Sequence, residues 1–268
     1  MRGKSILRLA CLAVLAVPAF SMAQTSRLYL TDFNNQNSYI VQGGAVIGTF
    51  SRASNTDNAL AITTEIRTFE RSSGNGSRYD LNGAFLGGLA SSNPGFIDCY
   101  DGTTDGQHTW TVAHNDFNTN FAVIVGGADW SGAAVSFVPV DRSSGITYDV
   151  TDNTLWIARN VGGSDGIAHY TTGGAFIGQF LFGVFHSGGY GLALDPVDNT
   201  LWLPGGFGDS GKLFQYSKTG TLLNTLTVSG LSGTNIMGAE FATVPEPGTL
   251  IALGLGALTL LGLRRRKR

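Results

Sequence analysis

The sequence predicts an all-β fold, a β-propeller of five four-stranded blades, on three observations. The segment Asp149–Ile157 (DVTDNTLWI) returns as Asp195–Leu203 (DPVDNTLWL), and Trp110, Trp156 and Trp202 follow one another at intervals of 46 residues. Glycine is abundant, and short apolar segments alternate with turn-forming dipeptides. The two ends of the repetitive region match different strands of the same repeat. A two-sheet β-sandwich is the alternative.

Each repeat is expected to form four short strands. The first has the pattern of Gly191–Leu194 (GLAL), and an Asp-Asn turn leads to the second, of the type Thr154–Ile157 (TLWI). The third ends at Tyr170 or Tyr216, and a Gly-containing turn leads to the fourth. Such turns supply positive φ and join antiparallel strands tightly. Four strands in about 45 residues make one propeller blade, and the pattern resembles the NHL and related propeller repeats.

The repeats can be counted by two markers. The turns before the fourth strands lie at Gly44, Gly83, Gly132, Gly174 and Gly220. The first strands open near Ala59, Gly95, Gly145, Gly191 and Gly238. Both markers give five blades. Because Arg27–Leu30 fits a second strand and Gly238–Phe241 fits a first strand, we expect the two ends to pair within one blade, which would remove an open sheet edge.

The N-terminus has the order of a secretory signal peptide. Arg2, Lys4 and Arg8 precede an apolar stretch, Leu9–Phe20, and Ser21-Met22-Ala23 then supplies small residues for cleavage after Ala23. The apolar stretch is short for a transmembrane helix. We therefore expect residues 1–23 to be removed on export.

The C-terminus has three parts in a fixed order. The segment Val244-Pro245-Glu246-Pro247-Gly248 is followed by the uncharged run Thr249–Leu263 and by five cations, Arg264, Arg265, Arg266, Lys267 and Arg268. The run can insert in a bilayer that thins around it, and the cations would hold the end in the cytoplasm. A permanent tail anchor is the alternative to a removable one.

This tail resembles the PEP-CTERM sorting signal. The resemblance implies that signal peptidase and then exosortase process the chain in a Gram-negative bacterium. The protein would stay in the inner membrane only transiently and would pass to the cell surface or the exopolysaccharide. It implies a sorting signal over residues 244–268, which leaves residues 24–243 as the propeller domain.

The charge of the body excludes one class of partner. Residues 24–244 carry 9 basic and 18 acidic side chains, and nucleic-acid binding needs a basic surface instead. Cys99 is the only cysteine outside the signal peptide, so no disulfide can form within the mature chain.

Several local patterns resemble functional sites. Thr111–Asn115 (TVAHN) and Gly208–Gly211 (GDSG) mimic a trypsin-like protease, but the repeat explains both as loop copies. Asp98, Asp101 and Asp105 crowd one Gly-rich segment that we expect to be a loop, where calcium is an alternative to ordinary acidic turns. The four histidines show no short ligand spacing: His108, His114, His169 and His186. The tryptophans are expected to pack between blades rather than to form sugar platforms.

Two functions remain open for the body. The first is a binding or structural module of the extracellular matrix, associated with exopolysaccharide or biofilm. The second is a secreted propeller enzyme, such as a hydrolase, lactonase or lyase, which would need a polar cluster at the channel mouth. The sequence designates no catalytic residue and no cofactor.

Overall fold

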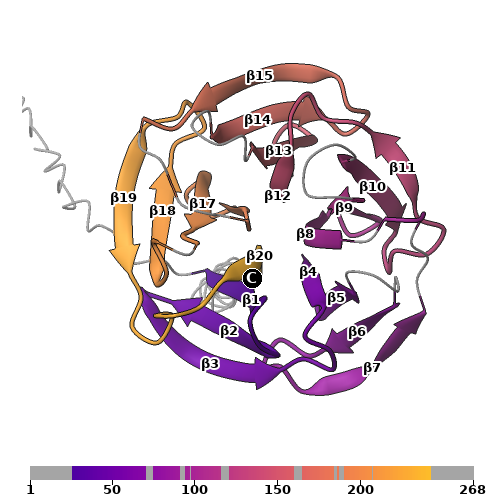
Figure 1. The fold of residues 1–268 in the computed structure, drawn as a ribbon, viewed down its shortest axis with the longest axis vertical. Helices are drawn as coiled ribbons and strands as arrows, with labels where there is room; N and C mark the ends of the chain where they lie inside the picture. The colour runs from indigo at the N-terminus through magenta and orange to yellow at the C-terminus, as the bar shows by residue number, and fades with distance from the viewer. Residues whose placement is uncertain are drawn as a thin grey trace, which may run out of the picture.

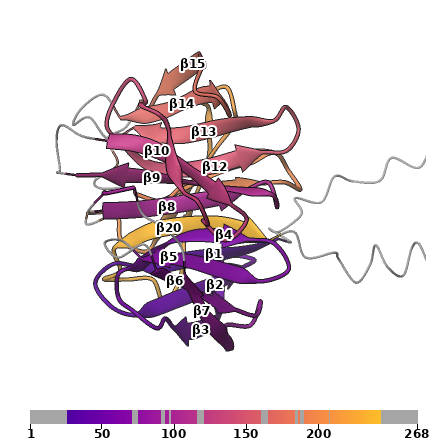
Figure 2. The same cartoon turned by 90° about the vertical axis from the view of Figure 1, so that its right-hand side faces the viewer.

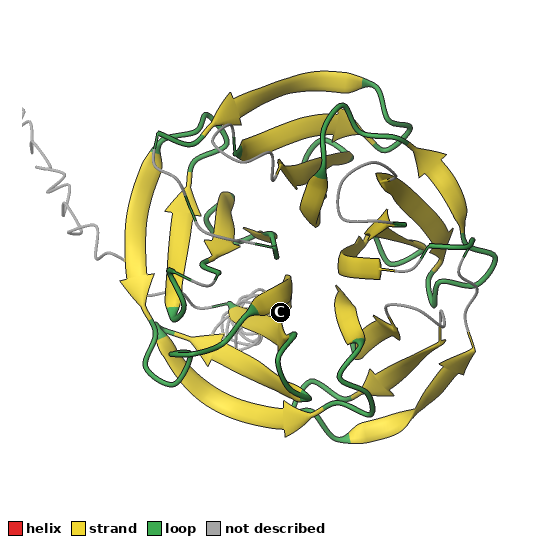
Figure 3. Cartoon of the chain, viewed as in Figure 1, coloured by secondary structure: helices red, strands yellow, loops and turns green. Residues whose placement is uncertain are grey.

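The computed structural model describes residues 26–70, 75–90, 94–96, 98–115, 121–159, 165–183, 186, 190–206 and 208–242. These residues contain twenty strands in five four-stranded antiparallel sheets, which surround a central axis like the blades of a propeller (Figures 1 and 3). The predicted propeller and its blade count are confirmed, and the β-sandwich alternative is wrong.

The blades are numbered 1 to 5, and the strands of each blade are given from the innermost to the outermost. Blade 1 contains β20 (Ile236–Ala242), β1 (Arg27–Asp32), β2 (Asn37–Gln42) and β3 (Ala45–Ser51). Blade 2 contains β4 (Asp57–Ile62), β5 (Ile66–Glu70), β6 (Asn75–Tyr79) and β7 (Phe85–Ala90). Blade 3 contains β8 (Asp98–Thr104), β9 (His108–His114), β10 (Phe121–Gly127) and β11 (Ala134–Phe137). Blade 4 contains β12 (Ser143–Asp149), β13 (Thr154–Arg159), β14 (Gly166–Thr171) and β15 (Phe176–Leu181). Blade 5 contains β16 (Ala193–Asp195), β17 (Thr200–Pro204), β18 (Lys212–Tyr216) and β19 (Leu222–Thr227).

Blade 1 joins the two ends of the chain. Strand β20 pairs with β1 in antiparallel register, with Arg27 opposite Ala242 and Leu30 opposite Ala239. Figure 2 shows these two strands side by side. The predicted closure of the ring is confirmed, and it leaves no gap between the last repeat and the first.

Turn chemistry explains why the blades repeat. Asn153 and Asn199 have φ of 58° and 61°, at equivalent turns between the first and second strands of blades 4 and 5. Gly174 and Gly220 have φ of 87° and 88°, at the turns before the fourth strands. Asparagine and glycine adopt these left-handed conformations more readily than other residues.

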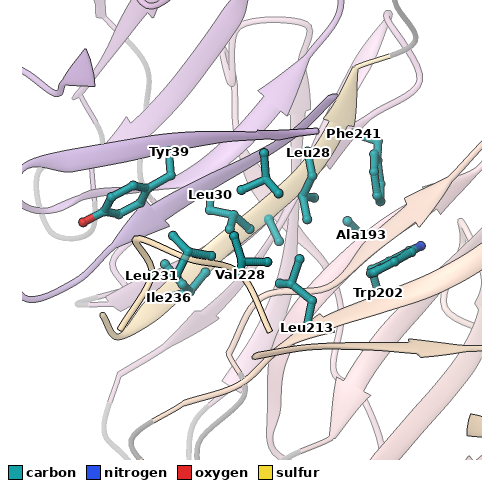
Figure 4. Close-up of a cluster of buried hydrophobic side chains, with 12 residues drawn as sticks. Leu28, Leu30, Tyr39, Ala193, Trp202, Leu213, Val228, Leu231, Ile236 and Phe241 are labelled. Atoms are coloured by element: carbon teal, nitrogen blue, oxygen red, sulfur yellow. The ribbon is translucent and has the colours of Figure 1, made fainter. Parts of the chain in front are cut away.

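The apolar core lies between neighbouring blades. Inner strands such as β4 and β20 are buried along their whole length, whereas the outermost strand β19 is mostly exposed. Trp156 and Trp202 are 5% and 3% exposed, each in the second strand of its blade. Figure 4 shows Trp202 beside Phe241 where blade 5 meets blade 1, and the two rings form an edge contact at 6.3 Å between centroids. The prediction that these tryptophans pack between blades is confirmed.

One predicted strand opening is wrong. Trp110, Trp156 and Trp202 pair with Thr103, Thr147 and Ala193 in the first strands of their blades. Two residues before these partners lie Asp101, Gly145 and Gly191. The position equivalent to Gly145 and Gly191 is therefore Asp101 and not the predicted Gly95. The repeat marker was missed because blade 3 replaces the glycine by aspartate.

Candidate binding site at the mouth of the central channel

The Asp101 carboxylate crosses the propeller axis. Its Oδ2 accepts hydrogen bonds from the backbone N–H groups of Ile146 in blade 4 (3.0 Å) and Leu192 in blade 5 (2.8 Å). Its Oδ1 accepts one from Ala239 in blade 1 (2.9 Å). Each donor directly follows the glycine of its own blade that is equivalent to Asp101. One fully buried side chain thus ties blade 3 to three other blades.

The glycines opposite Asp101 let the inner strands approach one another. A Cβ on Gly191 would lie 2.9 Å from the Cβ of Ala239, and one on Gly238 would lie 2.1 Å from the carbonyl oxygen of Asn58. Both distances are below van der Waals contact. The axis is therefore filled at this level by one aspartate among small residues.

Glu240 lies two residues beyond Gly238 on the same inner strand. The residue is 8% exposed, and its carboxyl group accepts hydrogen bonds from the Thr103 hydroxyl and the Phe241 N–H. Among the described residues its Oε2 atom has no hydrogen-bond partner. A buried polar atom without a partner is costly, so Glu240 needs a special environment to be retained here.

The local environments of Asp101 and Glu240 determine which of these two carboxyl groups holds a proton more readily. Burial raises the pKa of Asp101, although the N–H groups of Ala239, Ile146 and Leu192 oppose that rise. Burial also raises the pKa of Glu240, and the neighbouring Asp101 carboxylate raises it further. Because N–H donors already occupy both Asp101 oxygens, a proton is better placed on Glu240.

A pocket of 570 Å³ opens beside Glu240 on the face where the first strands end. All five blades contribute to it, with Phe241, Ile62, Asp105, Tyr148 and Leu194 as examples from blades 1 to 5. This volume falls within the range of about 300–1,000 Å³ that is common for small-molecule sites. The pocket is therefore the mouth of the central channel, with Glu240 in its lining.

The lining suits recognition of an uncharged, oxygen-bearing molecule. Apolar side chains form much of the wall, and the hydroxyl groups of Thr63, Thr64 and Thr104 and the Asp105 carboxylate add hydrogen-bonding groups. Among the described residues that line the pocket there is no histidine or cysteine. The described part of the chain also contains no cluster of three or more His, Cys, Asp or Glu side chains that could hold a metal ion.

A smaller cavity of 210 Å³ lies between blades 4 and 5. Trp156 and His169 stack in it with ring centroids 3.8 Å apart and planes 3° from parallel. Lys218 of blade 5 forms an ion pair with Asp149 of blade 4. Burial opposes ionisation of Asp149, but hydrogen bonds from Lys218, Thr151 and Trp156 lower its pKa. These contacts connect blades 4 and 5.

The predicted sorting residues lie outside the described part of the chain. They are the cleavage residue Ala23, the motif Val244, Pro245, Glu246, Pro247 and Gly248, and the cations Arg264, Arg265, Arg266, Lys267 and Arg268. The predicted span Thr249–Leu263 also lies outside it. Within the described residues, no helix has the length and apolar character needed to cross a bilayer.

The expected acidic loop is wrong. Asp98 and Asp101 belong to β8, and Asp105 follows that strand. Asp105 accepts hydrogen bonds from the backbone N–H groups of Gln107 (2.7 Å) and His108 (2.6 Å). The Asp101 carboxylate accepts three backbone hydrogen bonds at the propeller axis. The acidic residues that the sequence grouped for calcium therefore have separate structural partners in a strand and a turn.

The protease-like segments lie in different blades. His114 is buried on β9 of blade 3, where its Nε2 lies 2.5 Å from the carbonyl oxygen of Ser143. The Ser210 hydroxyl in blade 5 donates to the carbonyl oxygen of Leu231 (3.1 Å). Of the other three histidines, His108 contacts Asp105, His169 contacts Trp156 and His186 contacts Tyr216. The loop predicted for Thr111–Asn115 is wrong, because Thr111–His114 belongs to β9, whereas Gly208–Gly211 lies in the turn before β18.

Sequence reasoning missed Glu240. The signal that could have found it is a departure from the repeat: Gly238-Ala-Glu-Phe241 carries glutamate where Gly191-Leu-Ala-Leu194 carries alanine. An ionisable residue on a strand that the repeat buries needs a special environment. The same reasoning identifies Asp101, which stands where the other blades carry glycine or alanine.

Comparisons with known proteins concern the C-terminal tail and the propeller separately. A protein-family model described as "PEP-CTERM protein-sorting motif" matches residues 243–267. No curated protein sequence matches the chain. A chain of the nidogen/laminin complex is similar in structure, with a TM-score of 0.54 and 11% identity over 81% of this chain and 98% of that chain. A gluconolactonase from Xanthomonas campestris has a TM-score of 0.51 and 15% identity over 78% of each chain. At these identities the structural likeness shows the fold alone.

Proposed function

We propose that this protein is a surface-displayed module that binds saccharide units of exopolysaccharide at the channel mouth. Its five-bladed propeller is followed by a PEP-CTERM sorting motif. The motif implies an exported protein, processed by exosortase and held at the cell surface. In this proposal signal peptidase removes residues 1–23, exosortase cuts at Pro245–Pro247, and the propeller of residues 24–243 remains as the working part. It acts as a matrix or biofilm component.

The observation that carries the proposal is the pocket beside Glu240. A saccharide offers hydroxyl and ether oxygens that can accept a hydrogen bond from a protonated carboxyl group. Its C–H faces can pack on apolar walls such as Tyr148 and Phe241, while Thr63 and Thr64 supply further polar contacts. Acidic groups elsewhere on the body would not repel an uncharged sugar.

The pocket supports binding better than catalysis. A hydrolase or lactonase of this shape would need a nucleophile or a general base beside the bond to be cut. The described lining offers Glu240, whose raised pKa favours the protonated form, and Asp105, which accepts hydrogen bonds from its own turn. The fold of a gluconolactonase is therefore not by itself an argument for its reaction here.

The proposal can be tested by filling the pocket. Thr64 is exposed at the pocket wall, so Thr64→Trp should block entry without disturbing the core. Gln36 is exposed in the loop after β1, at the opposite end of the blade, and Gln36→Trp is the matched control. Binding of the mature proteins to purified exopolysaccharide of the native host would be measured by affinity electrophoresis and calorimetry.

We expect Thr64→Trp to weaken binding at least about tenfold, a loss of about 1.4 kcal/mol, and Gln36→Trp to bind like the natural protein. Glu240→Leu should also weaken binding, whereas Glu240→Gln keeps an N–H donor and should retain more of it. Equal binding by both tryptophan variants would exclude the pocket. If the natural protein does not bind the polysaccharide, the function that remains for the propeller is a structural one in the matrix.

A further inference from the structure

The pocket and both ends of the propeller lie on one face of the molecule. Phe241 lines the pocket, Ala242 is the next residue, and Ala242 pairs with Arg27 near the start of the described chain. The loops after the first strands of blades 2 to 5 lie on this face and contribute Thr63, Asp105, Val150 and Pro196 to the pocket. We call it the tail-bearing face.

The tail-bearing face is held close to the membrane by a short connection. Only residues 243–248 separate Ala242 from Thr249, where the uncharged run begins. Seven residue steps span at most about 25 Å, even when fully extended. The polar zone of one bilayer leaflet is itself about 5–8 Å thick. If the run Thr249–Leu263 inserts as the sequence predicts, an uncut chain therefore keeps this face within a short distance of the lipid headgroups.

The connection starts near the axis of the propeller rather than at its rim. Strand β20 is the innermost strand of blade 1, and Figure 1 shows it beside the centre of the ring. A short tether at the centre of a disc brings the whole face toward the membrane, whereas a tether at the rim would let the disc stand on edge. The placement of β20 thus favours an orientation with the channel mouth toward the lipid.

Most of the exposed large apolar side chains lie at the same end of the blades, whereas Val138, Val140 and Leu181 are exposed at the other end. Val150 and Val197 are 68% and 62% exposed in the loops after the first strands of blades 4 and 5. At the starts of outer strands, just after the turns on this face, further apolar side chains are exposed: Phe85, Leu86, Phe176, Ile177, Leu222 and Leu223. Apolar side chains at an interface gain free energy when they leave water.

Charge does not supply the attraction. The turns of this face carry Asp80, Asp105, Asp152 and Asp198, and cations such as Lys218 are fewer. An acidic face is repelled by anionic lipid, so tethering and apolar contact must hold it. A short tether raises the local concentration of one partner beside the other to the millimolar range, and a weak contact is then enough.

We propose that the tail-bearing face docks on the outer leaflet of the inner membrane while the sorting tail is uncut, and that cleavage at the motif uncovers the channel-mouth pocket. The docking partner is the phospholipid interface beside the chain's own membrane segment. The inference rests on the proposed function because it regulates the same pocket. Ligand binding would thereby be confined to protein that has been released for the surface.

The orientation can be measured without any saccharide. The mature chain with its tail intact would be reconstituted in phosphatidylcholine vesicles, where no exosortase is present to cut it. A bimane fluorophore would be attached at Val150→Cys or Val197→Cys on the tail-bearing face, or at Gln36→Cys on the opposite face as the matched control. Cys99 is fully buried and would not compete for the label in the folded protein. Headgroup spin-labelled lipid then quenches fluorophores that touch the interface.

We expect several-fold stronger quenching at Val150 and Val197 than at Gln36, unchanged when part of the lipid is replaced by phosphatidylglycerol. Inserting about twenty Gly/Ser residues after Ala242 adds a root-mean-square reach of about 25 Å. This insertion should weaken the quenching at Val150 and Val197. Circular dichroism would verify that each variant is folded. Equal quenching at the two faces, or quenching that requires anionic lipid, would overturn the inference.

This experiment separates the inference from the proposed function. Strong quenching at Val150, combined with equal polysaccharide binding by Thr64→Trp and Gln36→Trp, would keep the docking and reject the pocket as the binding site. Weak quenching at Val150, combined with loss of polysaccharide binding by Thr64→Trp, would keep the pocket as the binding site and reject the docking.

Discussion

The Oδ1 atom of Asp101 in blade 3 accepts a hydrogen bond from the N–H of Ala239 in blade 1, at 2.9 Å across the propeller axis. Ala239 belongs to β20, the last described strand and the one that closes the ring. Closure therefore depends on more than the pairing of β20 with β1. It is reinforced from the centre by a side chain that also holds blades 4 and 5.

The first prediction concerns this central carboxylate. Asp101→Ala removes the acceptor of three buried backbone N–H groups and should lower the free energy of unfolding by about 3–5 kcal/mol. Asp101→Asn keeps one acceptor oxygen but turns an NH₂ group toward a backbone donor, and should cost less. Urea denaturation of the mature protein measures both changes. A loss below about 1 kcal/mol for the alanine variant would show that the axis does not need the carboxylate.

The second prediction concerns the close approach of the inner strands. A Cβ at position 238 would lie 2.1 Å from the carbonyl oxygen of Asn58, and the backbone must move to admit it. Gly238→Ala should therefore destabilise the protein by about 2–4 kcal/mol. Gly178→Ala on the outer strand β15 is the control, because a Cβ there meets nothing within 4 Å. Equal melting temperatures of the two variants would contradict this packing.

The third prediction concerns Trp156 and Trp202. Both are buried between blades, so either change to alanine should cost about 3–5 kcal/mol, as is usual for large buried aromatic residues. The indole N–H of Trp156 donates to Asp149 (3.1 Å), and that of Trp202 donates to Thr200 (3.0 Å). Chemical denaturation with tryptophan fluorescence would check the cost. An effect below about 1 kcal/mol at either position would reject the packing role.

The fourth prediction is a pH dependence due to Glu240. Its pKa is raised in the folded protein above the ordinary value of 4.5, so the folded state keeps a proton that the unfolded state releases. This stabilisation is complete below that value and is lost as the pH rises toward the raised pKa, by about 1.4 kcal/mol per pH unit. Glu240→Gln cannot titrate and serves as the control.

The difference in unfolding free energy between the natural protein and Glu240→Gln should accordingly fall as the pH increases above about 4.5. Parallel pH profiles for the two proteins would mean that Glu240 titrates as it does in water. A difference that increases with pH would place an ionised Glu240 in the folded state.

The sequence predicts the fold well because the propeller repeats local chemistry. The Asp-Asn turns ending at Asn153 and Asn199, the turn glycines Gly174 and Gly220, and the tryptophan period each act within a single blade. The phases of Arg27–Leu30 and Gly238–Phe241 then determine how the ring closes.

The candidate site could not be predicted in the same way. The pocket combines residues from five blades, so no contiguous segment contains it. Asp101 was grouped with Asp98 and Asp105 by proximity along the chain, whereas its partners, Ile146, Leu192 and Ala239, lie 45, 91 and 138 residues away. Only the departures of Asp101 and Glu240 from the repeat could have indicated residues at the axis.

The fifth prediction concerns the sorting tail. Replacing Glu246 and both neighbouring prolines by alanine should leave the propeller folded but keep the protein in the inner membrane, because exosortase processing requires the motif. The tail cations are expected to resist translocation, since each costs roughly 2.5–3.5 kcal/mol at the bilayer centre. Cell fractionation of the native host would locate the variant, and normal surface display of it would contradict the role of the motif.

The central claim is that the propeller reaches the surface without its membrane segment. Intact-mass spectrometry of protein recovered from the surface of the native host tests it most directly. The account predicts a chain that starts at residue 24 and ends at or beside Pro245-Glu246-Pro247. Recovery of mature protein that still carries Leu250–Arg268 would show a permanent anchor and contradict the account.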